Sequence, residues 1–198
     1  MRAREPKSQK VKRKSAAWEW VESIIVALIL ALLIRQFIIQ AFKIPTGSMR
    51  TTLIEGDRII VSKFIYGANI PFVDWRLPAL RQPKRGDVIV FVYPQDRKKD
   101  FIKRLIALGG ETVEIKNGSI YINGSASKEP LLSNRYYYNR PESTYGKEAQ
   151  AVTVPADCYY VLGDNSSSSQ DSRYWGFVPK KNILGKAILI YWPPNRMR

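Results

Sequence analysis

One long apolar run near the N-terminus limits what this chain can fold into. As an α-helix, residues 18–39 would span about 33 Å, which is enough to cross a bilayer. Glu19, Glu22 and Arg35 restrict the uncharged part to residues 23–34. Charged side chains near helix ends can reach the headgroups, and the two tryptophans at the start of the run suit the membrane interface. We therefore predict a transmembrane anchor over residues 18–39.

The segment before the anchor is basic. Its first 14 residues hold seven Lys and Arg against one Glu, and residues 1–17 show no apolar periodicity. We expect residues 1–17 to form a disordered cytoplasmic arm, which would place everything after Gln40 outside. A cleavable signal peptide shows a similar pattern, but no small-x-small site follows cleanly, so we favour an uncleaved anchor.

The charge of the whole chain raises the question of its partner. The formal net charge is +15 over 198 residues. No zinc-finger spacing, RNP-like aromatic block or helix-turn-helix pattern supports a nucleic-acid partner. A basic cluster beside an apolar helix gains about 1 kcal/mol per Lys or Arg from an anionic membrane surface. We expect anionic lipid headgroups as partner and no nucleic acid, and the sequence leaves the oligomeric state open.

The rest of the chain is predicted to be mostly β. Its length allows one main folded unit, and its 12 Gly and 12 Pro favour many turns. Asn117-Gly118 between two short apolar runs indicates a type I′ hairpin. Strands are predicted at 57–64, 87–93, 101–108, 112–116, 119–123, 151–154, 159–162 and 187–192.

These strands suggest a division of the chain. Residues 110–150 hold the predicted hairpin and a polar segment with little core pattern, so they are expected to form an insertion. The insertion would separate residues 40–109 and 151–198, which together make the main β domain. The predicted fold class is mostly β, with antiparallel sheets and a smaller β-hairpin insertion, preceded by one N-terminal transmembrane helix.

Two absences limit the chemistry. The chain has no histidine, and Cys158 is its single cysteine. A Ser-His-Asp triad, a Cys/His zinc site and an intrachain disulfide are therefore excluded. We read Cys158 as a small core residue, and we expect no metal and no cofactor. A serine nucleophile would need activation by a lysine, by a carboxylate or by its backbone surroundings.

The candidate serine is Ser48, on the Gly-flanked turn of residues 44–49 close behind the anchor. The candidate base is Lys103, which a strand over 101–108 places on one face with Phe101 and other apolar residues. A base pKa near 7–8 requires lowering the lysine pKa by about 3 units, and burial supplies such a shift. By pattern alone, an ordinary lysine on a half-exposed strand remains the alternative.

A second constellation lies near the C-terminal end. In an extended backbone, Ser169, Asp171 and Arg173 would share one face, where the acid and the base would pair. Residues 163–165, Gly-Asp-Asn, indicate a turn in which the Asp or Asn side chain bonds to backbone.

Taken together, these residues resemble the bacterial type I signal peptidases, the Ser/Lys membrane-bound leader peptidases. The similarity runs from Arg35 to Pro193, and its motifs keep the order of that family. They are residues 42–49 (FKIPTGSM), 56–57 (GD), 85–91 (RGDVIVF), 101–104 (FIKR), 163–165 (GDN) and 171–176 (DSRYWG).

The resemblance implies a role for each matched residue. Ser48 would be the nucleophile and Lys103 the general base. The oxyanion hole would combine the Ser48 N–H with the Thr46 hydroxyl, at a position where the family often has serine. Ser169 would orient the lysine, with Asp171 and Arg173 as the supporting pair. The pockets that select Ala-x-Ala ends would be lined by apolar residues: Phe42, Ile44, Pro45, Met49, Leu53, Ile59, Val90, Phe101 and Ile102.

The implied function is a membrane-bound serine endopeptidase that removes signal peptides from exported preproteins after small-x-small sites. It would sit in the bacterial cytoplasmic membrane with a single crossing and its catalytic domain on the outer face. Ser166 departs from the family, which commonly has Arg there, so which serine of the tract 166–169 meets Lys103 is left open.

The sequence allows three rival interpretations. Ser125-x-x-Lys128 matches the motif of penicillin-interacting acyltransferases, but it lies in a polar segment and its companion motifs are missing. A self-cleaving repressor would need a DNA-binding domain where this chain has its apolar run. A non-catalytic, membrane-anchored basic β domain that binds lipid or a partner protein is the alternative function.

Overall fold

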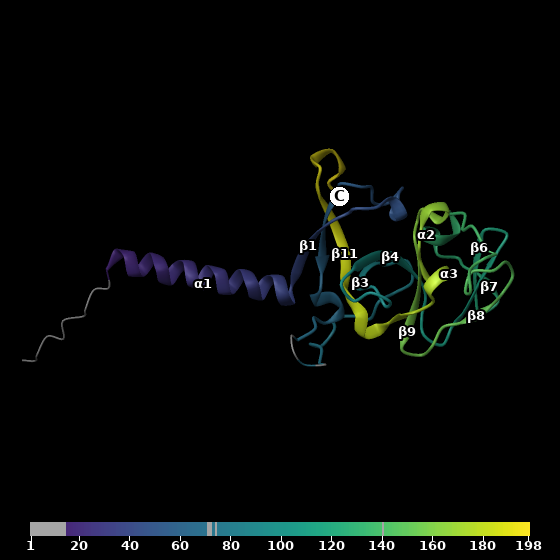
Figure 1. Ribbon diagram of the computed structural model, residues 1–198, viewed down its shortest axis with the longest axis horizontal. Helices are drawn as coiled ribbons and strands as arrows, with labels where there is room; N and C mark the ends of the chain where they lie inside the picture. The colour runs from purple at the N-terminus through teal and green to yellow at the C-terminus, as the bar shows by residue number, and fades with distance from the viewer. Residues whose placement is uncertain (1–14, 71–72, 74, 140) are drawn as a thin grey trace, which may run out of the picture.

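The structure is a computed structural model that describes residues 15–70, 73, 75–139 and 141–198. A single long helix, α1 (Ala16–Phe37), projects from a β-rich body (Figure 1). The predicted arm at residues 1–17 lies almost wholly outside the described residues. The mostly β fold class with antiparallel sheets and one N-terminal apolar helix is confirmed.

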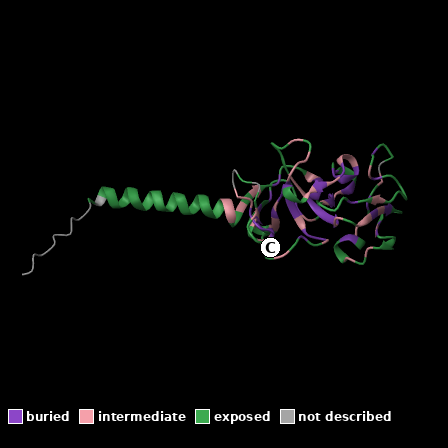
Figure 2. Cartoon of the chain, turned by 90° about the horizontal axis from the view of Figure 1, so that it is seen from below, coloured by how far each residue is buried: buried purple, intermediate pink, exposed green. Residues whose placement is uncertain are grey.

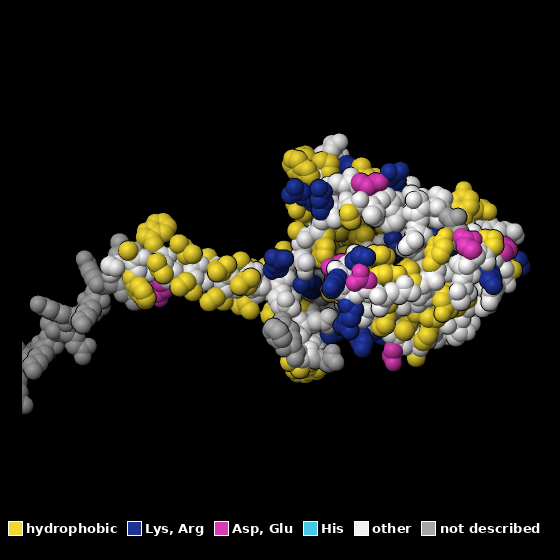
Figure 3. All heavy atoms as spheres, viewed as in Figure 1, with side chains coloured by type: hydrophobic (Ala, Val, Ile, Leu, Met, Phe, Trp, Pro, Cys, Tyr) yellow, Lys and Arg dark blue, Asp and Glu magenta, His cyan; other side chains and the backbone are white. Residues whose placement is uncertain are grey.

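Helix α1 is exposed along nearly its whole length, whereas buried residues fill the body (Figure 2). Its surface is largely apolar (Figure 3). The side chain of Ser15 accepts a hydrogen bond from the Trp18 N–H and caps the start of the helix. Arg35 lies in the last turn, where its positive charge interacts favourably with the helix dipole. By length and composition, Ala17–Phe37 is sufficient to cross a membrane.

The helix ends earlier than the sequence pattern predicts. It was expected to run to Ile39, but Ile39 begins strand β1 (Ile39–Lys43). The Lys63 N–H donates to the Ile38 carbonyl at 2.9 Å, and β1 pairs with the next strand from there on. Two β-branched residues in a row suit this pairing better than another helical turn, which apolar character alone does not reveal.

The larger sheet has seven antiparallel strands in the order β1-β2-β11-β3-β4-β9-β10. Strands at distant positions in the chain are thus neighbours, and the sheet joins residues from both sides of the predicted insertion. Besides β1, its strands are β2 (Arg58–Ser62), β3 (Val88–Val92), β4 (Asp100–Ala107), β9 (Cys158–Leu162), β10 (Val178–Pro179) and β11 (Ile183–Trp192).

The smaller sheet has four strands in the order β7-β6-β5-β8. They are β5 (Thr112–Lys116), β6 (Ser119–Ile122), β7 (Ser125–Ala126) and β8 (Val152–Thr153). The hairpin between β5 and β6 is confirmed: Lys116 pairs with Ser119, and Asn117 and Gly118 have φ values of 50° and 74°. The domain boundaries at residues 110 and 150 stay a prediction.

Short helices occupy several connections between strands. They are η1 (Gly47–Met49), η2 (Phe64–Tyr66), α2 (Pro130–Ser133), η3 (Ser166–Ser168), α3 (Ser172–Trp175), η4 (Lys180–Asn182) and η5 (Pro194–Arg196).

All eight predicted strands exist, with ends that differ by up to two residues except in β11. That strand begins at Ile183 rather than at residue 187. Gly185 lies inside it, where a Cβ would overlap the Ser62 carbonyl, so the glycine permits a close approach of β2 instead of interrupting the strand. The sequence pattern missed β1, β7 and β10, the last two of which have two residues each.

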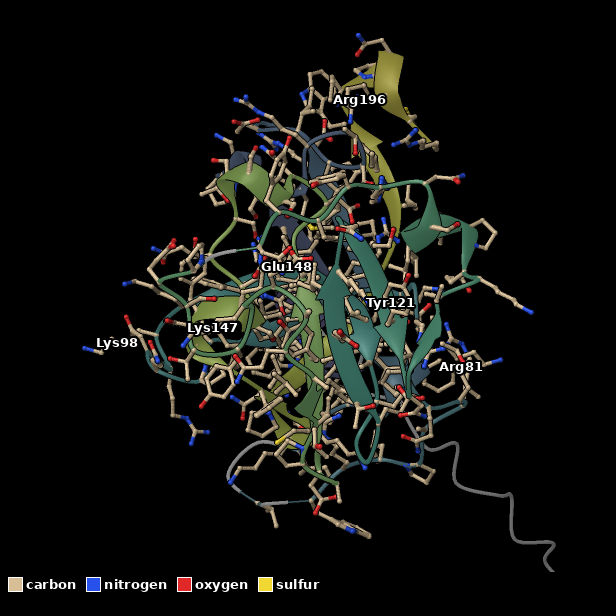
Figure 4. All side chains as sticks on the ribbon, turned by 90° about the vertical axis from the view of Figure 1, so that its right-hand side faces the viewer. Arg81, Lys98, Tyr121, Lys147, Glu148 and Arg196 are labelled. Carbon is tan, nitrogen blue, oxygen red and sulfur yellow. The ribbon has the colours of Figure 1, made fainter. Side chains whose placement is uncertain are left out.

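Two turns of the body are built in the same way. Gly56 and Gly86 have φ values of 92° and 88°, and each precedes a buried aspartate. Asp57 accepts a hydrogen bond from the backbone N–H of the third residue before it and pairs with Arg196. Asp87 repeats the arrangement with a different arginine, Arg81. Figure 4 shows the two arginines well apart, so the two turns brace different parts of the body.

Candidate active site

Ser48 and Lys103 meet in the folded chain. Ser48 lies in η1, directly after the β1 segment, and Lys103 lies in β4, the fifth strand of the larger sheet in its spatial order. The Nζ atom of Lys103 lies 2.5 Å from the Oγ atom of Ser48. The two side chains are 8% and 4% exposed, so their contact is nearly sealed from solvent. The candidate nucleophile and the candidate base are thus within direct proton-transfer distance.

The surroundings of Lys103 make its neutral form more accessible than that of an exposed lysine. Burial lowers the pKa of Lys103 to about 8, and the Arg173 charge also lowers it, against the opposing effect of the Asp171 and Asp164 carboxylates. No described carboxylate forms an ion pair with the lysine within 4 Å. The Phe101 ring centroid lies 5.6 Å from Nζ, as expected for two residues on one strand face.

The turn that carries Ser48 is held by the loop that follows β9. The Asn165 N–H donates to the Ser48 carbonyl at 3.0 Å, and the Asn165 side-chain amide donates to the Gly47 carbonyl at 3.0 Å. The sequence pattern indicated a turn in which Asp or Asn bonds to backbone, and it missed that this backbone lies more than a hundred residues away. Asn165 is therefore a positioning residue that sequence reasoning overlooked.

The neighbouring Asp164 forms a buried ion pair with Arg104. The Arg104 guanidinium donates to both carboxylate oxygens, at 2.7 and 2.6 Å, and also to the Gly86 carbonyl at 2.6 Å. Thr52 donates its hydroxyl to the same carboxylate at 2.5 Å. The pair joins β4, the loop after β9 and the chain beyond η1, so it fixes the elements that carry Lys103 and Ser48.

Asp171 and Arg173 form the expected pair, but on a different backbone. Both are fully buried, with 2.8 Å between the guanidinium and the carboxylate. The expectation of an extended segment was wrong at its end, because Ser172 begins the short helix α3 and Asp171 is its N-cap. Asp171 also accepts the Gly163 N–H at 3.0 Å.

Arg173 organises the serine tract. Its guanidinium donates to the Ser166 hydroxyl at 2.8 Å and to the Ser166 carbonyl at 2.9 Å, and it reaches the Tyr138 carbonyl at 2.5 Å. The Tyr138 N–H donates to the same hydroxyl at 2.8 Å. Ser166, which departs from the family pattern, is thus satisfied by the supporting arginine.

Ser169 is buried close to the dyad. Within the described residues its Oγ has no hydrogen-bond partner, so the structure shows no bond from Ser169 to Lys103. A Cβ on Gly163 would overlap both the Ser169 hydroxyl and the Ser48 carbonyl, so these two groups flank the same glycine. The hydroxyl therefore lies beside the catalytic turn with free donor and acceptor capacity.

Thr46 lies on the exposed approach to the turn. It has an extended backbone, with φ −134° and ψ 154°, immediately before η1. Its side chain is in a position accessible to a ligand, two residues from Ser48.

The residues predicted to line the substrate pockets divide into two groups. Seven of the nine belong to one apolar cluster beside η1, in which Phe42 and Ile102 are only partly buried. These seven are Phe42, Ile44, Met49, Leu53, Ile59, Val90 and Ile102. Pro45 is exposed, and Phe101 stacks on Tyr93 at 4.4 Å between ring centroids, next to a different cluster.

Comparisons with known proteins identify the family of the chain. The family model described as signal peptidase, peptidase S26, matches residues 17–192. Signal peptidase I of Leptolyngbya laminosa is 39% identical over 98% of this chain and 88% of its own. Signal peptidase I of Pseudomonas aeruginosa is 34% identical over 96% of this chain and 78% of its own.

Signal peptidase I P of Bacillus subtilis subsp. natto is 35% identical over 97% of each chain. A solved signal peptidase I from Enterococcus faecalis V583 is 34% identical and covers 55% of this chain and 98% of its own, with a TM-score of 0.44. Because the family model spans most of the chain and the Leptolyngbya, Pseudomonas and Bacillus enzymes exceed 30% identity over nearly all of it, the chain belongs to the signal peptidase family, peptidase S26, and is a serine protease.

Proposed function

We propose that this signal peptidase cleaves exported preproteins after small-x-small sites, with Ser48 as nucleophile and Lys103 as general base. The observation that carries the proposal is the 2.5 Å contact between Lys103 Nζ and Ser48 Oγ in a buried setting. With no histidine in the chain, a neutral lysine is the base that this setting favours.

The reaction uses each group in turn. Neutral Lys103 takes the Ser48 hydroxyl proton as Oγ attacks the scissile carbonyl carbon, which leaves a negatively charged tetrahedral intermediate. When the intermediate collapses, the lysine ammonium returns that proton to the departing amine of the mature protein. A water molecule then attacks the Ser48 ester with Lys103 again as base. The lysine ammonium returns this proton to Ser48 Oγ as the ester bond breaks, and the signal peptide leaves with a free carboxylate.

The oxyanion would be stabilised by the Ser48 N–H and the Thr46 hydroxyl. The proposal is supported by the exposed position of Thr46, which leaves its hydroxyl available to a substrate, two residues before the nucleophile. Donors of this type are worth about 2.7–4 kcal/mol in the transition state.

Ser169 is proposed to orient the lysine, with Asp171 and Arg173 as its support. The buried and unpaired Ser169 hydroxyl supports this role, because a lysine that gains a proton during the reaction needs an acceptor nearby. The Asp171–Arg173 pair holds the loop, since Asp171 bonds Gly163 and Arg173 reaches the Ser169 carbonyl at 3.4 Å.

The apolar cluster beside η1 is proposed to form the shallow pockets that accept small side chains. Phe42 and Ile102 are partly exposed there, whereas Met49 is fully buried and would lie at the base of the pockets. We include Pro45 among the pocket residues because it is exposed, and Phe101 because its ring lies beside Lys103.

Helix α1 is proposed to anchor the enzyme in the bacterial cytoplasmic membrane, with the basic arm inside and the β body outside. The support is its length, its apolar composition and its exposure, together with the basic residues that precede it. Anionic headgroups on the inner side would attract the arm.

The test is cleavage of a precursor with an Ala-x-Ala site by the detergent-solubilised full chain. We expect Ser48→Ala and Lys103→Ala each to lose activity by at least about a thousandfold, and a metal chelator to have no effect. Lys99→Ala, at a more exposed lysine four residues before Lys103, is the matched control. Full activity of Lys103→Ala would refute the dyad. The non-catalytic alternative is set aside by the membership of this chain in a protease family.

A further inference from the structure

A hollow of about 630 Å³ lies away from the Ser48–Lys103 contact, and its wall is rich in cations. It forms between the segment after η2 and the region of η4. Four of its described lining residues are basic, namely Arg76, Arg97, Lys180 and Lys181, and none of its described lining residues is Asp or Glu. This charge imbalance indicates an anionic ligand.

Arg76 is the lining residue whose position the backbone fixes. One of its terminal nitrogens donates to the Lys181 carbonyl at 3.1 Å and to the Ile183 carbonyl, so the backbone holds the guanidinium in place. Its Nε is buried without a hydrogen-bond partner in the described part of the chain. Burial lowers the pKa of Arg76, and no described carboxylate compensates its charge. An oxyanion would satisfy both the free N–H and the charge.

Two more cations line the hollow. Arg97 and Lys181 are exposed, and neither forms an ion pair within the described residues. Lys180 has only a 3.5 Å contact with the very exposed Asp157. Among the described residues, the charges of Arg97 and Lys181 are therefore not neutralised by an ion pair.

The hollow lies at the end of the anchor. The side chain of Gln36, in the last turn of α1, donates to the carbonyl of Asn69, which lines the hollow, at 3.1 Å. Figure 1 shows the teal segment after η2 beside the end of α1, and Figure 3 shows Lys and Arg side chains gathered on the same side of the body. The ligand must therefore be one found where α1 leaves the membrane.

The rim of the hollow is apolar. Trp75 is 69% exposed and Leu80, in the same segment, is 66% exposed, and the hollow itself is walled in part by Leu77 and Tyr159. An exposed tryptophan beside cations suits the headgroup region of a bilayer, where one part of the site meets lipid chains and the other meets phosphate.

We propose that this hollow binds the phosphate of an anionic phospholipid in the outer leaflet, with Arg76, Arg97 and Lys181 as its ligands. The inference rests on the proposed anchoring by α1. A bound headgroup there would fix the height and tilt of the β body relative to the bilayer, because the site and the helix end are hydrogen-bonded to each other.

The experiment uses the full chain in uncharged dodecyl maltoside micelles with a phosphatidylglycerol probe that has a photoreactive diazirine in its headgroup. We expect ultraviolet light to attach the probe to peptides that contain residues 75–83 and 180–183. Unlabelled phosphatidylglycerol should compete, whereas phosphatidylcholine and millimolar inorganic phosphate should not.

Two charge-matched variants make the test specific. Arg97→Gln with Lys181→Gln should raise the probe concentration for half-maximal labelling at least about tenfold, because two charge-assisted contacts are lost. Lys98→Gln with Lys147→Gln removes the same charge from exposed lysines outside the lining, both labelled in Figure 4, and should leave labelling unchanged.

Three results would overturn the proposal. They are equal labelling of the two double variants, equal competition by phosphatidylcholine, and equal competition by inorganic phosphate, which would make this a site for the free anion. Cleavage of a soluble Ala-x-Ala peptide, measured on the same samples, reports on the Ser48–Lys103 dyad separately and should be unchanged in both double variants.

Discussion

The Asn165 N–H donates to the Ser48 carbonyl at 3.0 Å, so the loop after β9 holds the backbone of the proposed nucleophile. This bond depends on close packing at Gly163, where a Cβ would overlap the Ser48 carbonyl and the Ser169 hydroxyl. The positions of Ser48 and Ser169 are therefore coupled through one glycine.

Gly163→Ala is expected to reduce kcat by at least about tenfold, because a displacement of about 1 Å between reacting groups costs on the order of 100-fold. Cleavage kinetics on an Ala-x-Ala peptide measure the effect. Gly110→Ala is the control, since its Cβ would enter open space although its φ of 87° strains an alanine. An equal loss of kcat in both variants would show that the effect is general destabilisation.

The pH dependence of cleavage should report Lys103. Burial lowers the pKa of Lys103 to about 8, and the neutral form is the base. We therefore expect kcat/KM to fall tenfold per pH unit below an acid limb near pH 8, and to level off above it. An acid limb of kcat/KM near pH 10 would contradict a desolvated lysine base.

Lys103→Met should make the fold more stable at low pH while abolishing activity. The folded-state pKa of Lys103 is lowered from 10.5 to about 8, so its charge opposes folding below pH 8 by roughly 3 kcal/mol, and this effect vanishes as pH rises toward 10.5. Urea unfolding of the detergent-solubilised chain at pH 6 and pH 10.5 measures it. The gain should appear at pH 6 only, and Lys99→Met should show none.

Substitutions of Thr46 separate its hydroxyl from its methyl group. Thr46→Val keeps the shape and removes the proposed oxyanion donor, so kcat should fall roughly 100- to 1000-fold with a smaller change in KM. Thr46→Ser keeps the hydroxyl and should stay within about threefold of the unmodified enzyme. If Thr46→Val keeps its kcat, the second donor is another group.

The Asp171–Arg173 pair offers a double-mutant test. Arg173→Met leaves a fully buried carboxylate without its partner and should lower the free energy of unfolding by roughly 3–5 kcal/mol. Adding Asp171→Asn removes the stranded charge and should restore part of the loss. Urea unfolding gives all the values of the cycle, and additive losses would mean that the two side chains do not interact energetically.

Much of the local structure follows from local rules. The β5–β6 hairpin follows from Asn117-Gly118, because only a few residue types accept φ > 0 at both turn positions. The long N-terminal helix follows from its length and composition, although Ile39 belongs to β1 because pairing with β2 competes with the helix. Short strands such as β7 and β10 have too few residues for a periodic signal.

The sequence by itself determined which chemistry is possible. Without histidine, a serine nucleophile has few activators, and family motifs singled out Ser48 and Lys103 as the pair. Only the tertiary structure decided that the two atoms lie 2.5 Å apart, because the residues are 55 positions apart and come from different elements. It also decided that Asn165 holds the turn, that Arg104 pairs with Asp164, and that the half-buried Arg76 is held by the carbonyls of Lys181 and Ile183. The physical reason is that burial and long-range hydrogen bonds arise from packing between strands that are distant in the chain, and no local pattern records them.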